Sequence, residues 1–322
     1  MVQQLFYHES RSLSPYYNLA LEELLRSELL PAEAVLYLWR NEHTVVIGKH
    51  QSARHECDLE ALEADGVSLA RRKTGGGAVF HDAGNLNFTF LNRREDYDPG
   101  RNFEILLEAL KAVGVPAVLS GRNDLTAEGL KFSGNAFFKS AFVAYHHGTL
   151  MVEVSMERLS RYLRVSPLKL RAKGVRSVQS RVVNLRQLCP ALTLEALGKS
   201  LQSAFAASYS LPLQPGPRLN ETRIAEIEKT FASREWILGK AGGFDAASAK
   251  VEERFDWGSL LLVREGDSGK PNLYSDALDT EVVEYLRAEL PRVYPGPIPL
   301  PASFSPFQKK MVEDVNEILK RF

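Results

Sequence analysis

Residues 71–82 read Arg-Arg-Lys-Thr-Gly-Gly-Gly-Ala-Val-Phe-His-Asp, and no other stretch indicates more about the fold or the function. The three glycines at 75–77 carry no Cβ, so the backbone can bring its N–H groups close to a ligand. The guanidinium groups of Arg71 and Arg72 add charge and forked donors for phosphate or carboxylate. Because a strand-like segment precedes the stretch at 67–70, we predict an anion-binding loop between two strands.

The spacing of the glycines excludes the commoner nucleotide-binding motifs. No Gly-Lys-Ser or Gly-Lys-Thr follows, so the stretch is not a P-loop, and it does not fit the dinucleotide-binding fingerprint either. Three glycines taken alone are more often a flexible turn than a ligand site. The residues around the loop must therefore decide between the two interpretations.

Apolar spacing and turn residues predict an α+β chain with much antiparallel pairing. Helices are predicted at 18–30, 59–65, 102–113, 194–209, 221–231, 280–290 and 305–322. Strands are predicted at 34–39 and 44–47 as a hairpin, at 67–70, 85–90 and 255–263, and as short strands between 118 and 154. The strand at 85–90 alternates polar and apolar residues, which is typical of a half-buried strand, and Gly129 and Gly134 mark two turns.

Composition limits the class of function. A chain of 322 residues can form two domains, and the glycine-rich segment 239–248 has the composition of a linker, so we predict domains at 1–245 and 246–322. With 40 basic and 40 acidic residues, no global field favours nucleic acid or an anionic membrane. Two cysteines, Cys57 and Cys189, are too few for a disulfide framework, which favours a reducing cytoplasm.

Five blocks, in one order, resemble the lipoate-protein ligase A family. They are 71–82, 121–125 (Gly-Arg-Asn-Asp-Leu), 131–136 (Lys-Phe-Ser-Gly-Asn-Ala), 146–150 (His-His-Gly-Thr-Leu) and 173–185, which begins Lys-Gly-Val-Arg-Ser-Val. The resemblance is strong over roughly residues 1–190 and thinner in the last 75 or so. It implies a large mixed-sheet catalytic domain of the biotin/lipoate ligase type, followed by a small α+β C-terminal accessory domain.

The resemblance also implies a reaction. The expected enzyme uses ATP and Mg²⁺ to convert lipoate to lipoyl-AMP, and then transfers the lipoyl group to one lysine of an acceptor. Expected acceptors are the lipoyl domains of 2-oxoacid dehydrogenase E2 subunits and the glycine-cleavage H protein. Octanoate is a further expected substrate, because an apolar channel discriminates weakly between near-isosteres. We expect a cytoplasmic monomer with no nucleic-acid or membrane partner.

Residue roles follow from the same resemblance. Lys131 is the expected catalytic residue, because an ammonium there can stabilise charge that develops on phosphate and acyl oxygens. The expected ATP and lipoyl-AMP contacts are Arg72, Gly75, Gly76, Gly77, Ala78, Val79, Phe80, Asn85, Lys131, Lys173 and Arg181. The expected lipoate contacts are Arg72, Gly77, Lys131 and His147, and the expected magnesium contact is Asp124.

Several of these residues have a structural alternative. Arg71 fits an ion-pair partner as well as a ligand contact, and Asp82 fits a turn cap. His146 and His147 are adjacent on a predicted strand, so their side chains point to opposite faces and cannot chelate one metal ion in the usual way. We expect them to pack beside the site.

A basic segment is visible without any resemblance. From 158 to 186 there are nine Lys or Arg residues and no Asp or Glu. A basic run is ordinarily a solvated face or a nucleic-acid patch. The resemblance identifies this one as an adenylate-binding loop that closes over the intermediate and excludes water.

Three other functions remain open. An octanoyl or lipoyl transferase with a cysteine nucleophile would need an activated thiolate beside the acyl site, and neither cysteine falls between 131 and 149. An enzyme that accepts ready-made lipoyl-AMP, as the similar mammalian lipoyltransferases do, would share the main blocks. A non-catalytic sensor or RNA-binding module would have no need of Lys131 within an intact loop.

Overall fold

The computed structural model describes residues 1–121, 123–164, 182–239, 250–264 and 271–322. Its largest element is an eight-stranded sheet with the order β11-β1-β2-β6-β10-β9-β8-β7. These strands are β1 (Gln4–Glu9), β2 (Glu33–Trp39), β6 (Asn85–Arg93), β7 (Ala117–Ser120), β8 (Asp124–Ala127), β9 (Leu130–Lys139), β10 (Val143–Met151) and β11 (Leu213–Pro215). β1 pairs with β2 and β11 in parallel, and the other pairs are antiparallel, so the sheet is mixed.

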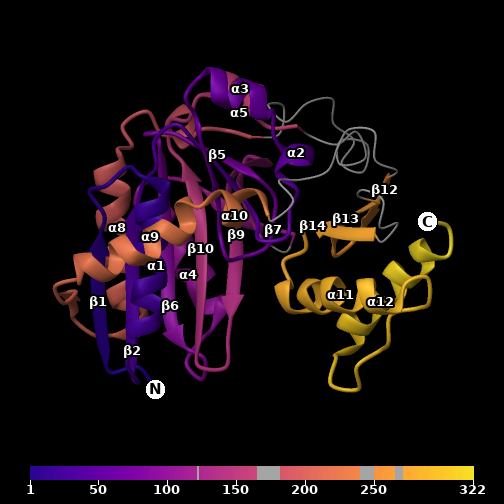
Figure 1. Cartoon of the computed structure of the whole chain (residues 1–322). Coiled ribbons are helices and arrows are strands. Elements are labelled where there is room, and N and C mark those ends of the chain that lie inside the picture. The colour runs from indigo at the N-terminus through magenta and orange to yellow at the C-terminus, as the bar shows by residue number, and fades with distance from the viewer. Residues whose placement is uncertain (122, 165–181, 240–249, 265–270) are drawn as a thin grey trace.

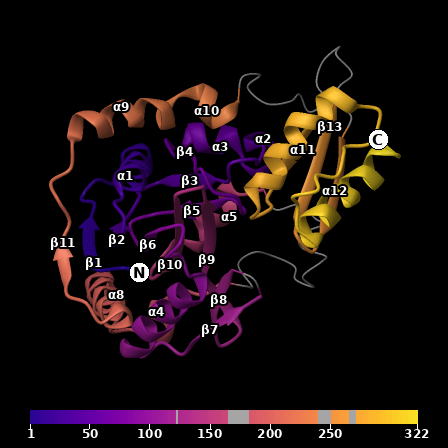
Figure 2. The same ribbon diagram turned by 90° about the horizontal axis from the view of Figure 1, so that it is seen from below.

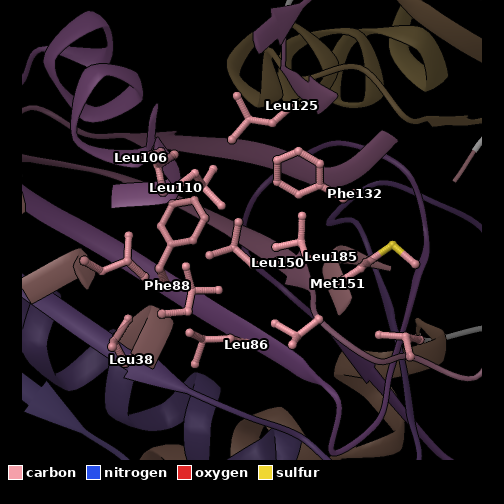
Figure 3. Packing of buried hydrophobic residues seen from close by; sticks show 14 of the residues in the cluster. Leu38, Leu86, Phe88, Leu106, Leu110, Leu125, Phe132, Leu150, Met151 and Leu185 are labelled. Atoms are coloured by element: carbon pink, nitrogen blue, oxygen red, sulfur yellow. The ribbon is translucent and has the colours of Figure 1, made fainter. Parts of the chain in front are cut away.

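Helices cover both faces of this sheet (Figure 2). α1 (Pro15–Glu28) and α9 (Glu221–Ala232) pack together on one face, and α4 (Pro99–Ala112) and α8 (Leu194–Tyr209) on the other. On the α4 side, Phe88 from β6, Leu150 from β10 and Leu106 from α4 converge in one apolar core (Figure 3). Burial of such side chains is the main driving force for this assembly.

A second sheet carries the glycine stretch. Its order is β4-β3-β5, from β4 (Ser68–Arg71), β3 (Thr44–Ile47) and β5 (Val79–His81). Residues 72–78 therefore connect β4 to β5, as predicted. Short helices adjoin these sheets: α2 (Ala53–Glu56), α3 (Leu59–Ala64), α5 (Met156–Tyr162), α7 (Leu185–Leu188) and α10 (Arg234–Leu238).

The C-terminal residues form a smaller unit beside the large one (Figure 1). A three-stranded antiparallel sheet, β12 (Lys250–Phe255), β13 (Gly258–Arg264) and β14 (Pro271–Ser275), packs with α11 (Thr280–Val293) and α12 (Pro306–Leu319). The apolar core of this unit draws its residues from 251–322 alone. The predicted boundary at 245 lies outside the described residues, as does the predicted linker at 239–248 apart from Gly239.

The structure confirms the predicted fold class and most elements, but it corrects some details. The strands at 34–39 and 44–47 exist, yet the predicted hairpin is wrong, because β2 and β3 belong to different sheets. His43, with φ of 47°, turns the chain between them. The strand predicted at 255–263 is two strands, β12 and β13, with the turn at 256–257.

Two further predictions about glycine and burial are also corrected. Gly129, with φ of 77°, does form the turn between β8 and β9, but Gly134 lies inside β9. β6 is buried on both faces rather than half-buried. Its polar residues Asn85, Asn87 and Thr89 are at most 1 % exposed, so its polar face lies inside the protein.

Two of the α-helices begin earlier than the spacing predicts. α1 starts at Pro15, where Ser14 accepts a hydrogen bond from the Tyr17 N–H, rather than at Asn18. α4 starts at Pro99 behind the cap Asp98. Proline at the first helical position has no N–H to satisfy, and its fixed φ suits the first turn.

Candidate active site

The glycine loop is held in place by Arg72, which is 7 % exposed. Its guanidinium donates to the carbonyls of Gly75 (2.6 Å), Gly77 (2.8 Å) and Val46 (3.2 Å), and its Nε donates to Thr74 Oγ1 (3.0 Å). Burial lowers the pKa of Arg72 to about 10, which leaves it charged at neutral pH. Arg72 thus positions the loop, and the ligand contact predicted for it stays a prediction.

Arg71 has a structural role. It donates to the carbonyls of Ile237 (2.7 Å), Gln51 (2.7 Å) and Gly48 (2.9 Å), and the Trp236 indole N–H donates back to the Arg71 carbonyl at 2.7 Å. A guanidinium at the C-terminal end of α10 meets carbonyls that the helix leaves unpaired. Arg71 therefore ties α10 to the segment after β3, through carbonyls rather than the carboxylate expected of an ion pair.

A cavity lies between the two sheets, beneath the glycine loop. It encloses about 620 Å³ with its open mouth included, which is within the range of small-molecule sites. Its lining residues come from α1, both sheets and the loop: Leu19, Trp39, Val46, Arg72, Gly76, Gly77, Ala78, Val79, His81, Asn87, Asn123, Lys131, Gly134, Asn135, Ala136, His147, Gly148 and Thr149.

A second cavity of about 710 Å³ adjoins the first. It is lined by Phe80, Asn85, Met151, Leu159, Leu163 and Val182, and by five residues that also line the first cavity: Ala78, Val79, Lys131, Gly134 and Thr149. The two cavities therefore meet around Lys131. A ligand in each would bring two reacting groups together at this lysine.

The ammonium group of Lys131 forms an ion pair with a carboxylate on the neighbouring strand. Its Nζ lies 2.7 Å from Oδ1 of Asp124, on the neighbouring strand β8. The side chains are 34 % and 22 % exposed, and Lys131 lines both cavities whereas Asp124 lines neither. Gly134 leaves room for the lysine, because a Cβ there would lie 3.3 Å from Nζ.

His147 links the glycine loop to a buried carboxylate. Its Nδ1 lies 2.8 Å from Glu22 Oε1 in α1, and its Nε2 lies 2.8 Å from Thr74 Oγ1. Glu22 also accepts from the Thr89 hydroxyl at 2.7 Å. Because a carboxylate only accepts, His147 donates a hydrogen bond to Glu22 through Nδ1. Its Nε2 then accepts a hydrogen bond from the Thr74 hydroxyl. The His147 ring also lines the first cavity.

The neighbouring His146 confirms that adjacent histidines face opposite ways. It is fully buried among the rings of Phe88, Phe103 and Phe137, on the α4 side of the sheet. Burial lowers the pKa of His146 to about 3, so the ring is neutral. Asp82 confirms the alternative of a turn cap, since it accepts from the N–H groups of Gly84 and Ser155.

The structure thus gathers most of the predicted site residues around the two cavities. Arg72, Gly76, Gly77, Ala78, Val79, Lys131 and His147 line the first, and Phe80 and Asn85 line the second. Gly75 approaches the small unit instead, and a Cβ on it would lie 2.1 Å from the Ala277 carbonyl oxygen. Lys173, Arg181 and most of the basic segment lie outside the described residues.

Several residues that line the first cavity were not among the predicted contacts. Leu19, Trp39, His81 and Asn87 line the cavity. Asn87 could have been found, because three polar residues at alternate positions of an internal strand need buried partners. Trp39 carried no such signal in the sequence.

Neither cysteine is placed for covalent catalysis. Cys57 is fully buried, and burial raises the pKa of its thiol to about 12, which keeps it protonated. Cys189 donates to the Val113 carbonyl, and neither sulfur lines a cavity at Lys131. The described residues therefore offer no activated thiolate beside the site.

Two kinds of feature are absent from the described residues. No helix in them is long and apolar enough to cross a membrane. They also contain no cluster of three or more His, Cys, Asp or Glu side chains arranged to hold a metal ion.

Comparison with known proteins gives one consistent result. The model of the lipoyl protein ligase A/B catalytic domain matches residues 14–206. Lipoate-protein ligase A of Psychrobacter cryohalolentis is 38 % identical over 330 residues, which cover 97 % of this chain and 96 % of the relative. The enzyme of the same name from Blochmanniella pennsylvanica is 37 % identical, with 87 % and 86 % covered.

Solved structures agree. P. falciparum LipL1, solved in complex with lipoate, superposes with a TM-score of 0.79 and 27 % identity, over 98 % of this chain and 99 % of that one. A lipoate-protein ligase A bound with ATP gives a TM-score of 0.65 and 25 % identity, over 74 % and 99 %. The bipartite ligase of Thermoplasma acidophilum, described with its E2 lipoyl domain, gives 0.66 and 26 %, over 74 % and 97 %. This chain therefore belongs to the lipoate-protein ligase A family.

Proposed function

We propose that this enzyme activates lipoate with ATP and then transfers the lipoyl group to a lysine of an acceptor lipoyl domain. The observation that carries the proposal is the position of Lys131 where two cavities meet. Lipoate in the first cavity and ATP in the second would place carboxylate and α-phosphate beside one ammonium. Relatives solved with lipoate and with ATP support this assignment of ligands.

The reaction needs charge stabilisation more than proton transfer. A lipoate oxygen attacks the α-phosphorus, the bond to the β-phosphate bridging oxygen breaks, and pyrophosphate leaves. Lys131 Nζ stabilises negative charge on the phosphate and then on the carbonyl oxygen when the acceptor amine attacks. AMP leaves and the new amide nitrogen loses its proton to solvent. The glycine loop, buttressed by Arg72, supplies backbone N–H groups to the same ligands.

The carboxyl of Asp124 is suited to hold Mg²⁺. The ion needs only one or two carboxylates when it also binds nucleotide phosphates. Asp124 is partly exposed beside Lys131, where those phosphates would lie. Such an ion would neutralise part of the phosphate charge.

The proposal also covers the acceptor proteins, the domain division, the oligomeric state and the cellular location of the enzyme. Its acceptors are E2 lipoyl domains and the glycine-cleavage H protein. The Thermoplasma relative, a ligase reported with its E2 lipoyl domain, supports the first of these. Residues 246–322 form a separate accessory domain, a division supported by their own apolar core. The low cysteine count supports a cytoplasmic location, and we propose that the protein acts as a monomer.

The test follows pyrophosphate release and acceptor mass in a mixture of ATP, Mg²⁺, lipoate and an apo lipoyl domain. Lys131→Ala should abolish both signals, whereas Lys139→Ala, an exposed lysine on the same strand, should retain them. Modification from supplied lipoyl-AMP without pyrophosphate release would show a transferase that lacks the activation step. No modification from either donor would reject the proposal.

A further inference from the structure

We propose that His81 and Asn87 form a pair of buried hydrogen-bond donors that recognises the sulfur-bearing ring of the bound acid and selects lipoate over acids with a plain hydrocarbon end. The inference rests on the proposed function and deepens it. It concerns the part of the first cavity that lies away from Lys131, where the sequence identified no site residue apart from His147.

The tautomer of His81 is determined by a relay of buried side chains. The amide nitrogen of Asn18 donates to the carbonyls of Arg40 (2.7 Å) and Ser12 (3.1 Å) and to Asn41 Oδ1 (2.9 Å). Asn41 must therefore turn its Nδ2 toward His81, whose Nδ1 lies 3.1 Å away. Since Nδ2 only donates, Nδ1 accepts, and the ring proton of the neutral imidazole is on Nε2.

The imidazole is also kept neutral. Burial, with the nearby charge of Arg72, lowers the pKa of His81 to about 3. Asn18, Asn41 and His81 are 0 %, 0 % and 3 % exposed, so the whole relay is internal. The buried side chains of Asn18 and Asn41 thus fix the neutral His81 ring with its proton on Nε2.

That N–H group has no partner among the described residues. His81 Nε2 is buried and unpaired, although His81 lines the first cavity. Asn87 repeats the pattern, because its Oδ1 accepts from Asn85 at 2.8 Å while its Nδ2 is buried and unpaired. Buried donors normally have a partner, so two unpaired donors on residues that line one cavity favour a ligand that accepts from them.

The position of the donors points to the far end of the ligand. In the large sheet, Asn87 on β6 lies opposite Trp39 on β2 and Thr149 on β10. Lys131 is on β9, two strands from β6, and the two strands are about 10 Å apart across the sheet at about 4.8 Å per strand. An acid with its carboxyl at Lys131 would therefore extend its other end toward Asn87, Trp39 and His81.

The chemistry fits a dithiolane ring. Divalent sulfur is polarisable and accepts hydrogen bonds weakly, whereas a hydrocarbon end accepts none. A hydrocarbon in this place would leave both donors buried and unpaired, and a polar site rejects such an analogue more strongly than an apolar pocket does. We expect a discrimination of about tenfold, since sulfur is a weak acceptor.

The experiment compares two acids of the same shape as substrates of the wild-type enzyme. One is lipoate, and the other is cyclopentylpentanoate, in which CH₂ groups replace both ring sulfurs. The measured quantity is kcat/KM for pyrophosphate release with ATP and Mg²⁺. Lipoate should be favoured about tenfold. Equal use of the two acids would overturn the inference while leaving the proposed ligase function intact.

Variants then identify the donors. In His81→Leu, kcat/KM should fall more with lipoate than with cyclopentylpentanoate, so that the ratio of the two values comes close to one. In His81→Gln the amide can accept from Asn41 and donate to the ring, so this variant should keep most of the preference for lipoate. The control is Asn102→Leu on α4, because Asn102 also has unpaired buried amide atoms but lines neither cavity. It should leave the ratio unchanged.

A loss of equal size with both acids in His81→Leu would overturn the inference, because it would mean that His81 serves the carboxyl end or the fold. Failure of wild-type enzyme to release pyrophosphate with either acid would overturn the proposed function instead. Calorimetric dissociation constants for the two acids would then still test the donors, and equal affinities would reject them.

Discussion

Lys131 and Asp124 face each other from neighbouring strands, with Nζ 2.7 Å from Oδ1, at the place where the two cavities meet. The carboxylate holds the ammonium in one position before any substrate binds. Both side chains are partly exposed, so solvent weakens this pair, and its value is in positioning more than in stability. The pair therefore supports the first of four predictions.

Asp124→Asn should slow pyrophosphate release at least about tenfold while the protein stays folded. The amide cannot pair with the ammonium, and it is a poorer ligand for Mg²⁺. Initial rates across a Mg²⁺ titration measure both effects, and the half-saturating concentration should rise. An unchanged Mg²⁺ requirement would contradict the magnesium role of Asp124 and leave only its contact with Lys131.

Gly148→Ala should destabilise the protein by about 1–3 kcal/mol. A Cβ on Gly148 would lie 2.6 Å from Asn135 Oδ1, 2.7 Å from Phe88 Cζ and 2.9 Å from the Gly134 carbonyl oxygen. These are atoms of a packed sheet and cannot all withdraw. Urea unfolding measures the change, with Gly77→Ala as control because a Cβ there meets nothing within 4 Å. Equal stability of the two variants would show that the sheet adapts.

Gly75→Ala should separate the small unit from the glycine loop. Its Cβ would lie 2.1 Å from the Ala277 carbonyl oxygen, between β14 and α11, which also accepts from the Gly76 N–H at 3.4 Å. The small unit has its own core, so it should stay folded while its position changes. Small-angle scattering should show a larger radius of gyration than for Gly77→Ala. The same radius for both variants would contradict this prediction.

Stability should fall as the pH is lowered from about 6.5 toward 3. His81 and His146 are buried and neutral, and their pKa values fall from 6.5 to about 3 on folding. Below pH 6.5 the unfolded chain takes up protons that the folded chain refuses, so each histidine costs up to about 1.4 kcal/mol per pH unit.

Unfolding free energies from urea titrations at pH 7 and pH 5 measure this dependence. His146→Leu should reduce the slope, since it removes one of the two groups and leaves an apolar side chain among three phenylalanine rings. A slope that is the same with and without His146 would mean that other groups control the acid sensitivity.

The sequence alone determined the local structure and much of the site. Residues 71–82 predicted a glycine loop between two strands, and the spacing of Leu and Ala residues predicted the helix at 194–209 with its observed bounds. These features depend on backbone freedom and on short-range apolar periodicity, which neighbouring residues set by themselves. Lys131 was identified as the catalytic candidate from its block, which carries a resemblance to a known family.

Only the tertiary structure decided which strands pair and which polar residues are internal. The hairpin predicted for 34–39 and 44–47 failed because β2 and β3 find better partners, β6 and β4, at greater sequence separation. In the sequence Asn87 looks like an exposed residue of a half-buried strand, and nothing marks His81 as a site residue, yet packing of the second sheet over the first encloses both. Burial is a property of the assembled layers, and it alone leaves these ordinary side chains with unpaired donors on residues that line a cavity.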